Sequence, residues 1–154
     1  MTKIILLGWK FVDADKIAKY LDEYQICYVS HQFSPITNTN EIIETIFNHS
    51  PDLVVAYASH KTTHIQYEIV YAEILKQKTN LILAVDFDGP TFHFRMDSDS
   101  LDKLDYITMP FPIEELILRI EHSLDPEAYK KKYTTAQRQD FLKNTPMATI
   151  PVNY

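Results

Sequence analysis

The sequence predicts an α/β domain built on a doubly wound parallel sheet of five strands, followed by a C-terminal helical arm. Short apolar runs recur along the chain, and segments with apolar residues at helical spacing separate most of them. Strands that alternate with helices are joined by right-handed crossovers and bury both faces of a parallel sheet. With five strands, the pattern favours the order 2-1-3-4-5.

The composition sets the size and limits the ligands. A chain of 154 residues with 45% hydrophobic content suits one well-buried domain and is too short for two ordinary ones. The net charge of −6 disfavours broad contact with nucleic acid, which requires clustered Lys and Arg. The one dense basic run, Lys130 to Lys132, is expected to be a solvated helix face. We therefore expect no nucleic-acid partner.

The first strand is expected over residues 3–9, a continuous apolar run suited to burial on both faces. A helix should follow over 13–23, with Asp13 placed to cap it. Its apolar residues at helical spacing are Ile17, Ala18, Tyr20, Leu21 and Tyr24. The second strand, 25–30, contains Cys27, the only cysteine. Cys27 should be a buried structural thiol, because a single cysteine forms neither an internal disulfide nor a thiolate zinc cluster.

The middle of the chain continues the alternation. Residues 31–40 are polar and contain a proline, which predicts a loop, and Asn40 could cap a helix over 41–50. Buried strands are expected over 52–59 and 80–87. The helix between them, 63–77, should turn the following residues inward: Ile65, Ile69, Ala72 and either Ile74 or Leu75.

The last third contains a loop, a strand and two helices. Residues 88–103 have no clear helical period, so a loop with at most a short helix is expected. The fifth strand should occupy 104–109 and the fifth helix 113–124. The apolar stripe of that helix is Leu116, Ile117, Ile120 and Leu124. Asp125 and Pro126 then favour a further helix to about Asn144 and an extended end. This tail, 125–154, should pack on the domain or reach a partner.

Several classes of site are disfavoured. The chain contains only Gly8 and Gly89, too few for a phosphate-binding glycine loop, so no cofactor is expected. His60, His64 and Glu68 stand four residues apart and would share a helix face, but His60 should precede the helix, so no metal site is expected. The N-terminus has neither a signal peptide nor a membrane span. We therefore expect a cytoplasmic protein without membrane contact.

Residues 105–120, "DYITMPFPIEELILRI", resemble the end of a bacterial receiver domain, the CheY-like fold. The resemblance extends over about residues 1–124 and implies the flavodoxin-like strand order. It also implies where the phosphorylation residues of that family would fall. The acidic pair that binds magnesium falls on Gly8 and Trp9, the phosphate acceptor on Tyr57, the switch hydroxyl near Val85 and the phosphate-binding lysine on Met109.

None of these five residues has the side chain that the receiver reaction requires. Magnesium prefers hard oxygen ligands, and a phenol with a pKa near 10 is not a carboxylate nucleophile. The resemblance therefore predicts a pseudo-receiver, a regulatory module that acts through protein–protein contacts. Such modules commonly meet a partner or a second copy through the fifth strand and helix. There, Tyr106, Phe111 and Ile113 are either apolar anchors or core residues.

A second resemblance predicts an enzyme. Residues 51–85 resemble part of the nucleoside deoxyribosyltransferase and nucleotide N-hydrolase family, and more loosely TIR domains. The resemblance implies that Glu68 attacks or stabilises the anomeric carbon of a nucleoside or nucleotide, with Thr62 holding phosphate and Glu44 as an acidic partner. The C-terminal "PVNY" is similar to that family's tyrosine-ended tail. However, His64 and Gln66 replace expected glycines, and Ile5 replaces an expected tyrosine.

Overall fold

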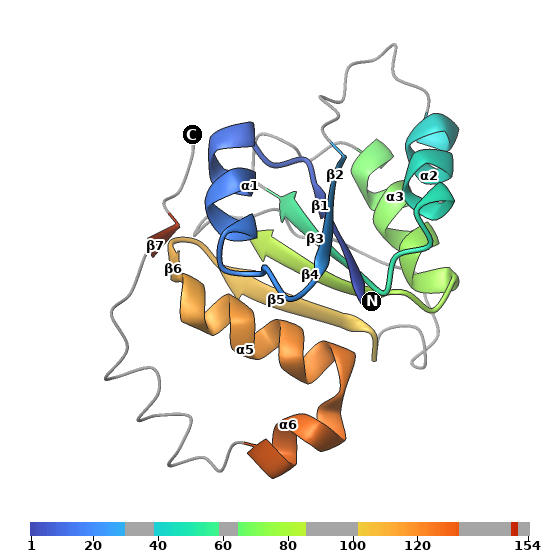
Figure 1. Cartoon of the computed structure of the whole chain (residues 1–154). Helices are drawn as coiled ribbons and strands as arrows, with labels where there is room; N and C mark the ends of the chain where they lie inside the picture. The colour runs from blue at the N-terminus through green and yellow to red at the C-terminus, as the bar shows by residue number, and fades with distance from the viewer. Residues whose placement is uncertain (30–38, 59–64, 86–101, 133–148, 151–154) are drawn as a thin grey trace.

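A computed structural model describes residues 1–29, 39–58, 65–85, 102–132 and 149–150. Five strands form one parallel sheet in the order β2-β1-β3-β4-β5, as the sequence predicts (Figure 1). The strands are β1 (Lys3–Leu7), β2 (Gln25–Val29), β3 (Leu53–Ala58), β4 (Asn80–Val85) and β5 (Leu104–Thr108). The inner strands β1, β3 and β4 are buried on both faces, which explains their continuous apolar sequences.

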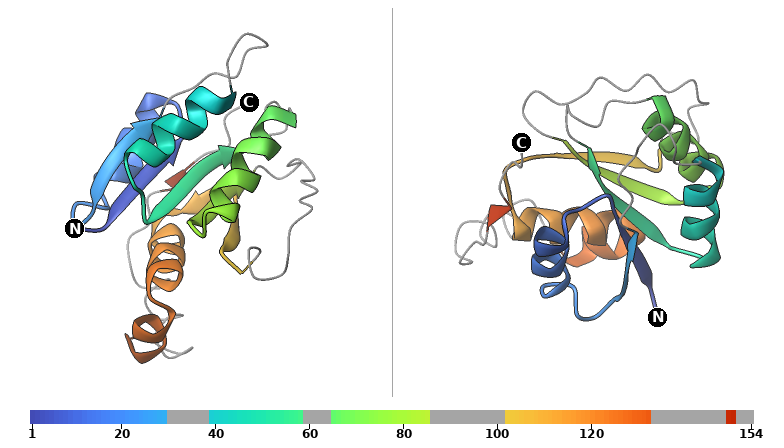
Figure 2. Two further views of the ribbon diagram at one scale, coloured as in Figure 1. Left: turned by 90° about the vertical axis from the view of Figure 1, so that its right-hand side faces the viewer. Right: turned by 90° about the horizontal axis from the view of Figure 1, so that it is seen from above.

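Two pairs of helices cover the opposite faces of the sheet. One face is covered by α1 (Phe11–Ala18) and α5 (Ile113–Leu124), and the other by α2 (Thr39–Asn48) and α3 (Ile65–Lys76) (Figure 2). Successive strand residues belong to different cores: Ile4 packs toward α1 and α5, whereas Ile5 packs toward α2 and α3. This alternation follows from the two-residue period of a strand. The α5 stripe is confirmed, with Leu116 and Ile120 buried and Ile117 and Leu124 partly buried.

Two predicted helix starts are wrong. Helix α1 begins at Phe11, so Asp13 lies in its first turn and does not cap it; Lys10 occupies the cap position without a side-chain cap hydrogen bond. The first turn is a favourable place for Asp13, because the helix dipole is positive there. Helix α2 begins at Thr39, which places Asn40 inside its first turn. In both helices the chain becomes helical before the residue whose side chain suits a cap.

Two predictions of burial are also wrong. Ile69 was expected to face inward, but 48% of its surface is exposed, because α3 buries the face that carries Val70, Tyr71 and Ile74. Cys27 is a free thiol and only partly buried. It lies in β2, the terminal strand of the sheet, where fewer neighbours cover a side chain than in a central strand.

The tail begins with α6 (Pro126–Lys132), which packs against α5. Asp125 Oδ1 accepts a hydrogen bond from Ala128 N at 3.1 Å, which confirms the predicted start of this helix. The remainder of the helix predicted to reach Asn144 lies outside the described residues. Farther on, β7 (Thr149–Ile150) pairs antiparallel with β6 (Phe111–Pro112). None of the helices within the described ranges is long and apolar enough to cross a membrane.

Candidate functional site

The carboxyl ends of parallel strands are where ligands bind in doubly wound sheets. The chain leaves β1 at Gly8, whose φ of 77° favours glycine and whose N–H donates to Val29 O at 2.9 Å. At this turn the backbone stays close to β3, because a Cβ on Gly8 would stand 3.6 Å from Tyr57 O. The turn directs the next residue, Trp9, over the end of the sheet.

Trp9 lies at the centre of an aromatic cluster formed by Trp9, Tyr57 and Phe111. Its indole is buried, and Nε1 donates a hydrogen bond to Val55 O at 2.9 Å. The indole meets the Tyr57 ring with centroids 5.3 Å apart and the Phe111 ring at 6.4 Å, both edge-on. Edge-to-face packing of this kind stabilises aromatic pairs beyond the area they bury. The aromatic cluster therefore fills the space beside the ends of β1 and β3.

Met109 closes the neighbouring part of this edge. Its side chain is fully buried in the core beneath α1 and α5, and its backbone N donates to Val85 O at 2.6 Å. The thioether has no N–H or O–H to offer a phosphoryl oxygen. The structure therefore brings Gly8, Trp9, Tyr57, Val85 and Met109 to one edge of the sheet, and Tyr57 supplies the only side-chain oxygen among these five.

The residues that could bind a partner at β5 are separated by the structure. Tyr106 is 43% exposed, and burial of the rest of its side chain raises the pKa of its phenol. Phe111 and Ile113 are buried, which contradicts their use as surface anchors and confirms the alternative of core packing. The reason is that the chain turns back after β5, so that Phe111 meets Trp9 and Ile113 begins the buried face of α5.

The residues of the predicted nucleotide site are only partly described. Glu68 lies in the first turn of α3 and is partly exposed, whereas Glu44 is exposed on α2. Ile5 is fully buried in β1. Thr62, His60, His64 and the end of the tail lie outside the described residues. In the portions of the chain that are described, no three His, Cys, Asp or Glu side chains are grouped so that they could hold a metal ion.

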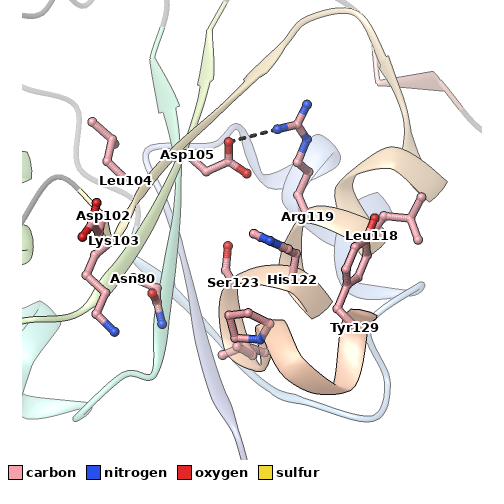
Figure 3. A pocket seen from close by; sticks show the side chains of 12 residues that line it. Asn80, Asp102, Lys103, Leu104, Asp105, Leu118, Arg119, His122, Ser123 and Tyr129 are labelled. Atoms are coloured by element: carbon pink, nitrogen blue, oxygen red, sulfur yellow. Dashed lines mark hydrogen bonds and ion pairs between the residues drawn. The ribbon is translucent and has the colours of Figure 1, made fainter. Parts of the chain in front are cut away.

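A pocket that sequence reasoning missed lies at the opposite, amino-terminal edge of the sheet. It has a volume of about 610 Å³ and lies between the starts of β4 and β5 and the helices α5 and α6 (Figure 3). Arg119 points across it to Asp105, with Nη1 and Oδ1 3.0 Å apart, and Arg119 Nε also donates to Glu115 Oε1 at 3.1 Å (Figure 3). Burial lowers the pKa of Arg119, but these two carboxylates outweigh burial and leave that pKa raised.

The charged groups of the pocket already bind one another. The guanidinium of Arg119 is shared between two carboxylates, and the ring of His122 meets the ring of Tyr129 edge-on at 5.1 Å. The helical spacing of Glu115 and Arg119 is the one sequence signal for part of this arrangement. The angle between α5 and α6, which opens the pocket, has no such signal.

Comparison with known proteins shows what the fold resembles. Neither a protein-family model nor a curated protein is similar enough to match the chain. A receiver-domain protein (CheY-like) from Methanospirillum hungatei is 13% identical with a TM-score of 0.55, covering 86% of this chain and 99% of that chain. A chain from the structure of histidine kinase ThkA in complex with response regulator TrrA is 22% identical with a TM-score of 0.56, covering 81% and 100%.

A longer protein shows the same similarity. NtrX from Brucella abortus is 15% identical with a TM-score of 0.57, and the match covers 93% of this chain but only 34% of that chain. At identities this low, the similarity is one of fold. The strand order β2-β1-β3-β4-β5, with α1 and α5 on one face, agrees with these structures. The protein therefore has the CheY-like receiver fold.

Proposed function

We propose that this protein is a receiver-like regulatory module that acts through protein–protein contacts and is not switched by phosphorylation. The observation that carries the proposal is the buried aromatic cluster at the carboxyl edge, with Met109 buried beside it. The similar structures are named as receivers and response regulators, and the resemblance assigns phosphoryl chemistry to this edge. Here the same edge contributes to the core.

Each group at this edge is unsuited to phosphoryl transfer for its own reason. The Trp9 indole N–H is engaged by Val55 O, and indole has no lone pair to offer a magnesium ion. Tyr57 packs against Trp9 and offers a phenol where a carboxylate nucleophile would be required. Met109 cannot neutralise a phosphoryl charge. Regulation through this module would then depend on which surfaces it presents to other proteins.

One such surface surrounds Tyr106, the exposed member of the three residues considered at β5. A half-buried tyrosine is a common anchor in protein interfaces, because its ring buries area and its hydroxyl keeps a polar contact. With its net charge of −6, the chain is better suited to a protein partner than to nucleic acid.

The test is incubation of the purified chain with acetyl phosphate and magnesium, followed by intact-mass measurement. We expect the mass to remain that of the unmodified chain, while a receiver domain that keeps its acidic pair gains a phosphoryl group in the same experiment. The Tyr57→Asp variant should also remain unmodified, because a carboxylate alone lacks the magnesium ligands. A stable gain of one phosphoryl group by the wild-type chain would refute the proposal.

The second candidate is an N-glycosidase or deoxyribosyltransferase, and one observation favours it. Glu68 is partly exposed in the first turn of the helix that follows β3, where the resemblance implies a nucleophile. The test is incubation with nucleosides, deoxynucleotides and NAD and chromatographic detection of free base. Release that is lost in Glu68→Ala but kept in Glu73→Ala, on the same helix, would support this enzyme. No release from any substrate removes it.

A further inference from the structure

The outer edge of β2 has the features of a pairing strand. β2 is the terminal strand of the sheet and, among the described residues, pairs only with β1. Gln25 N donates to Thr2 O and Val29 O accepts from Gly8 N, both at 2.9 Å, so the polar groups of these residues point toward β1. Because backbone direction alternates along a strand, the N–H and C=O groups of Ile26 and Tyr28 point away from β1.

The sequence of β2 contains none of the usual protection against pairing. Natural edge strands carry lysines, prolines, bulges or inward-pointing charges that prevent another strand from adding to them. The five residues Gln25–Val29 include no charged residue and no proline, and they pair in regular register with β1. In a chain whose net charge is −6, an uncharged strand is also a place where two copies can meet without like-charge repulsion.

Exposed apolar side chains gather next to this edge. Among the described residues, seven large apolar side chains are exposed, and four of them lie between Phe11 and Tyr28. The four are Phe11 (73% exposed), Val12 (76%), Tyr20 (46%) and Tyr28 (44%). The rings of Phe11 and Tyr28 are in contact, with centroids 6.2 Å apart. An apolar surface that continues onto an uncharged strand edge is typical of a protein interface.

We infer that two copies of this chain join through their β2 edges, antiparallel about a two-fold axis, to form one continuous sheet. In an antiparallel pair centred on Cys27, Ile26 of one copy faces Tyr28 of the other. The outward backbone groups of these two residues then form hydrogen-bonded pairs. This arrangement is self-complementary, as a two-fold interface requires. The inference goes beyond the proposed function and does not depend on it, since it uses neither the aromatic cluster nor Tyr106.

The central residue supplies a built-in probe of the register. The backbone of Cys27 points toward β1, so the two Cys27 residues would form a non-hydrogen-bonded pair, with Cα atoms about 4.5 Å apart. That separation lies within the range of a disulfide. Because Cys27 is the only cysteine, any covalent dimer that forms on oxidation must join the two copies at this position.

The first experiment measures the mass of the full chain by light scattering. We expect a dimer for the wild type and a monomer for Tyr28→Lys, in which two like charges enter the centre of the interface. The matched control is Tyr106→Lys, which puts the same charge at an equally exposed strand tyrosine (43%) and should remain dimeric. Circular dichroism confirms that each variant is folded. A monomeric wild type, or a Tyr28→Lys variant that stays dimeric, overturns the inference.

The second experiment keeps the interface intact and tests the register by mild oxidation with copper phenanthroline. Wild-type protein should form a reducible covalent dimer. In the same register Gln25 faces Val29 of the other copy, so the double variant Cys27→Ser, Gln25→Cys should not cross-link to itself. Equal cross-linking of the two proteins, or none by a dimeric wild type, contradicts the register. Neither result bears on phosphorylation, so the two proposals fail separately.

Discussion

The two ends of the sheet differ in how they use their side chains. At the carboxyl edge, the aromatic cluster and Met109 are packed together, and Trp9, Phe111 and Met109 are buried. At the amino-terminal edge, an open pocket between α5 and α6 is lined by charged and polar groups. In this fold the carboxyl edge is where ligands bind. The comparison teaches that a chain can keep the receiver fold while its carboxyl edge becomes part of the core.

The energetic consequences of the difference are opposite. Contacts at the carboxyl edge are dry, so each lost contact costs both transfer free energy and packing. The ion pairs at the amino-terminal edge involve Arg119, whose side chain is 37% exposed, and solvent screens pairs of this kind. Substitutions should therefore be much more costly at the carboxyl edge. The predictions below test this ordering.

The largest effect is expected for Met109→Lys. The variant would place an unpaired ammonium in a fully buried position and should reduce the free energy of unfolding by about 3–5 kcal/mol at neutral pH. Met109→Leu keeps the volume and should cost less than about 1.5 kcal/mol. Both values are measured by urea denaturation followed by circular dichroism. If the two variants are equally stable, the position is open to solvent and the comparison fails.

The pH dependence of the same variant sharpens the result. Burial would lower the pKa of the new lysine below its unfolded value of about 10.4. The unfolded chain then binds more protons than the folded chain between these two pKa values, so the stability of Met109→Lys should rise relative to Met109→Leu as the pH rises. A constant difference across this range would show that the cost arises from shape and not from the buried charge.

A smaller effect is expected for Trp9→Phe. The substitution keeps an aromatic ring in the cluster but removes the indole hydrogen bond to Val55 O, and we expect a loss of about 1–3 kcal/mol in unfolding free energy. Phe11→Ala, which truncates an exposed aromatic side chain two residues later, serves as the control and should change stability by less than about 0.5 kcal/mol. Circular dichroism is the suitable probe, since Trp9 is the only tryptophan.

If Trp9→Phe is as stable as the wild type, the indole hydrogen bond adds nothing to the packing of the rings. The aromatic cluster would then be held by shape alone, and Trp9→Ala would be needed to measure it. That larger truncation should cost about 3–5 kcal/mol.

Most of the sheet could be predicted from the sequence because a buried parallel strand is a local pattern. The apolar runs at 3–9, 52–59 and 80–87 mark β1, β3 and β4, and the alternation with helices then gives the strand order. Helix starts were less well predicted, since Asp13 and Asn40 suit both a cap and a first turn. The choice between them depends on how the preceding loop enters the helix.

The candidate site was predicted as a set of positions but not as an arrangement. Receiver resemblance identified Trp9, Tyr57 and Met109 one by one, but the edge-on packing of Trp9 on Tyr57 is a tertiary contact between residues far apart in the chain. Phe111 follows a strand and a proline, a position that suits an exposed anchor as well as a core residue. Only the turn of the chain back over the sheet edge decides that it is buried.

The smallest predicted effect tests the amino-terminal side of the comparison through Tyr24, which is partly buried beside α5. Burial raises the pKa of Tyr24 to about 12, and the carboxylates of Glu23 and Glu121 raise it further than Lys132 lowers it. In the unfolded chain a tyrosine has a pKa of about 10. The fold therefore favours the neutral phenol. Its contribution to stability is complete below about pH 10 and is lost as the pH rises toward 12.

Tyr24→Phe should accordingly lose stability less steeply than the wild type between about pH 10 and pH 12. Tyr20→Phe, which removes an exposed hydroxyl, is the matched control and should follow the wild type. The measurement is urea denaturation at several pH values. Equal slopes for Tyr24→Phe and the wild type would mean that solvent reaches Tyr24 freely. The contrast between the two edges would then be sharper, since even this partly covered side chain at the α5–α6 end would behave as surface.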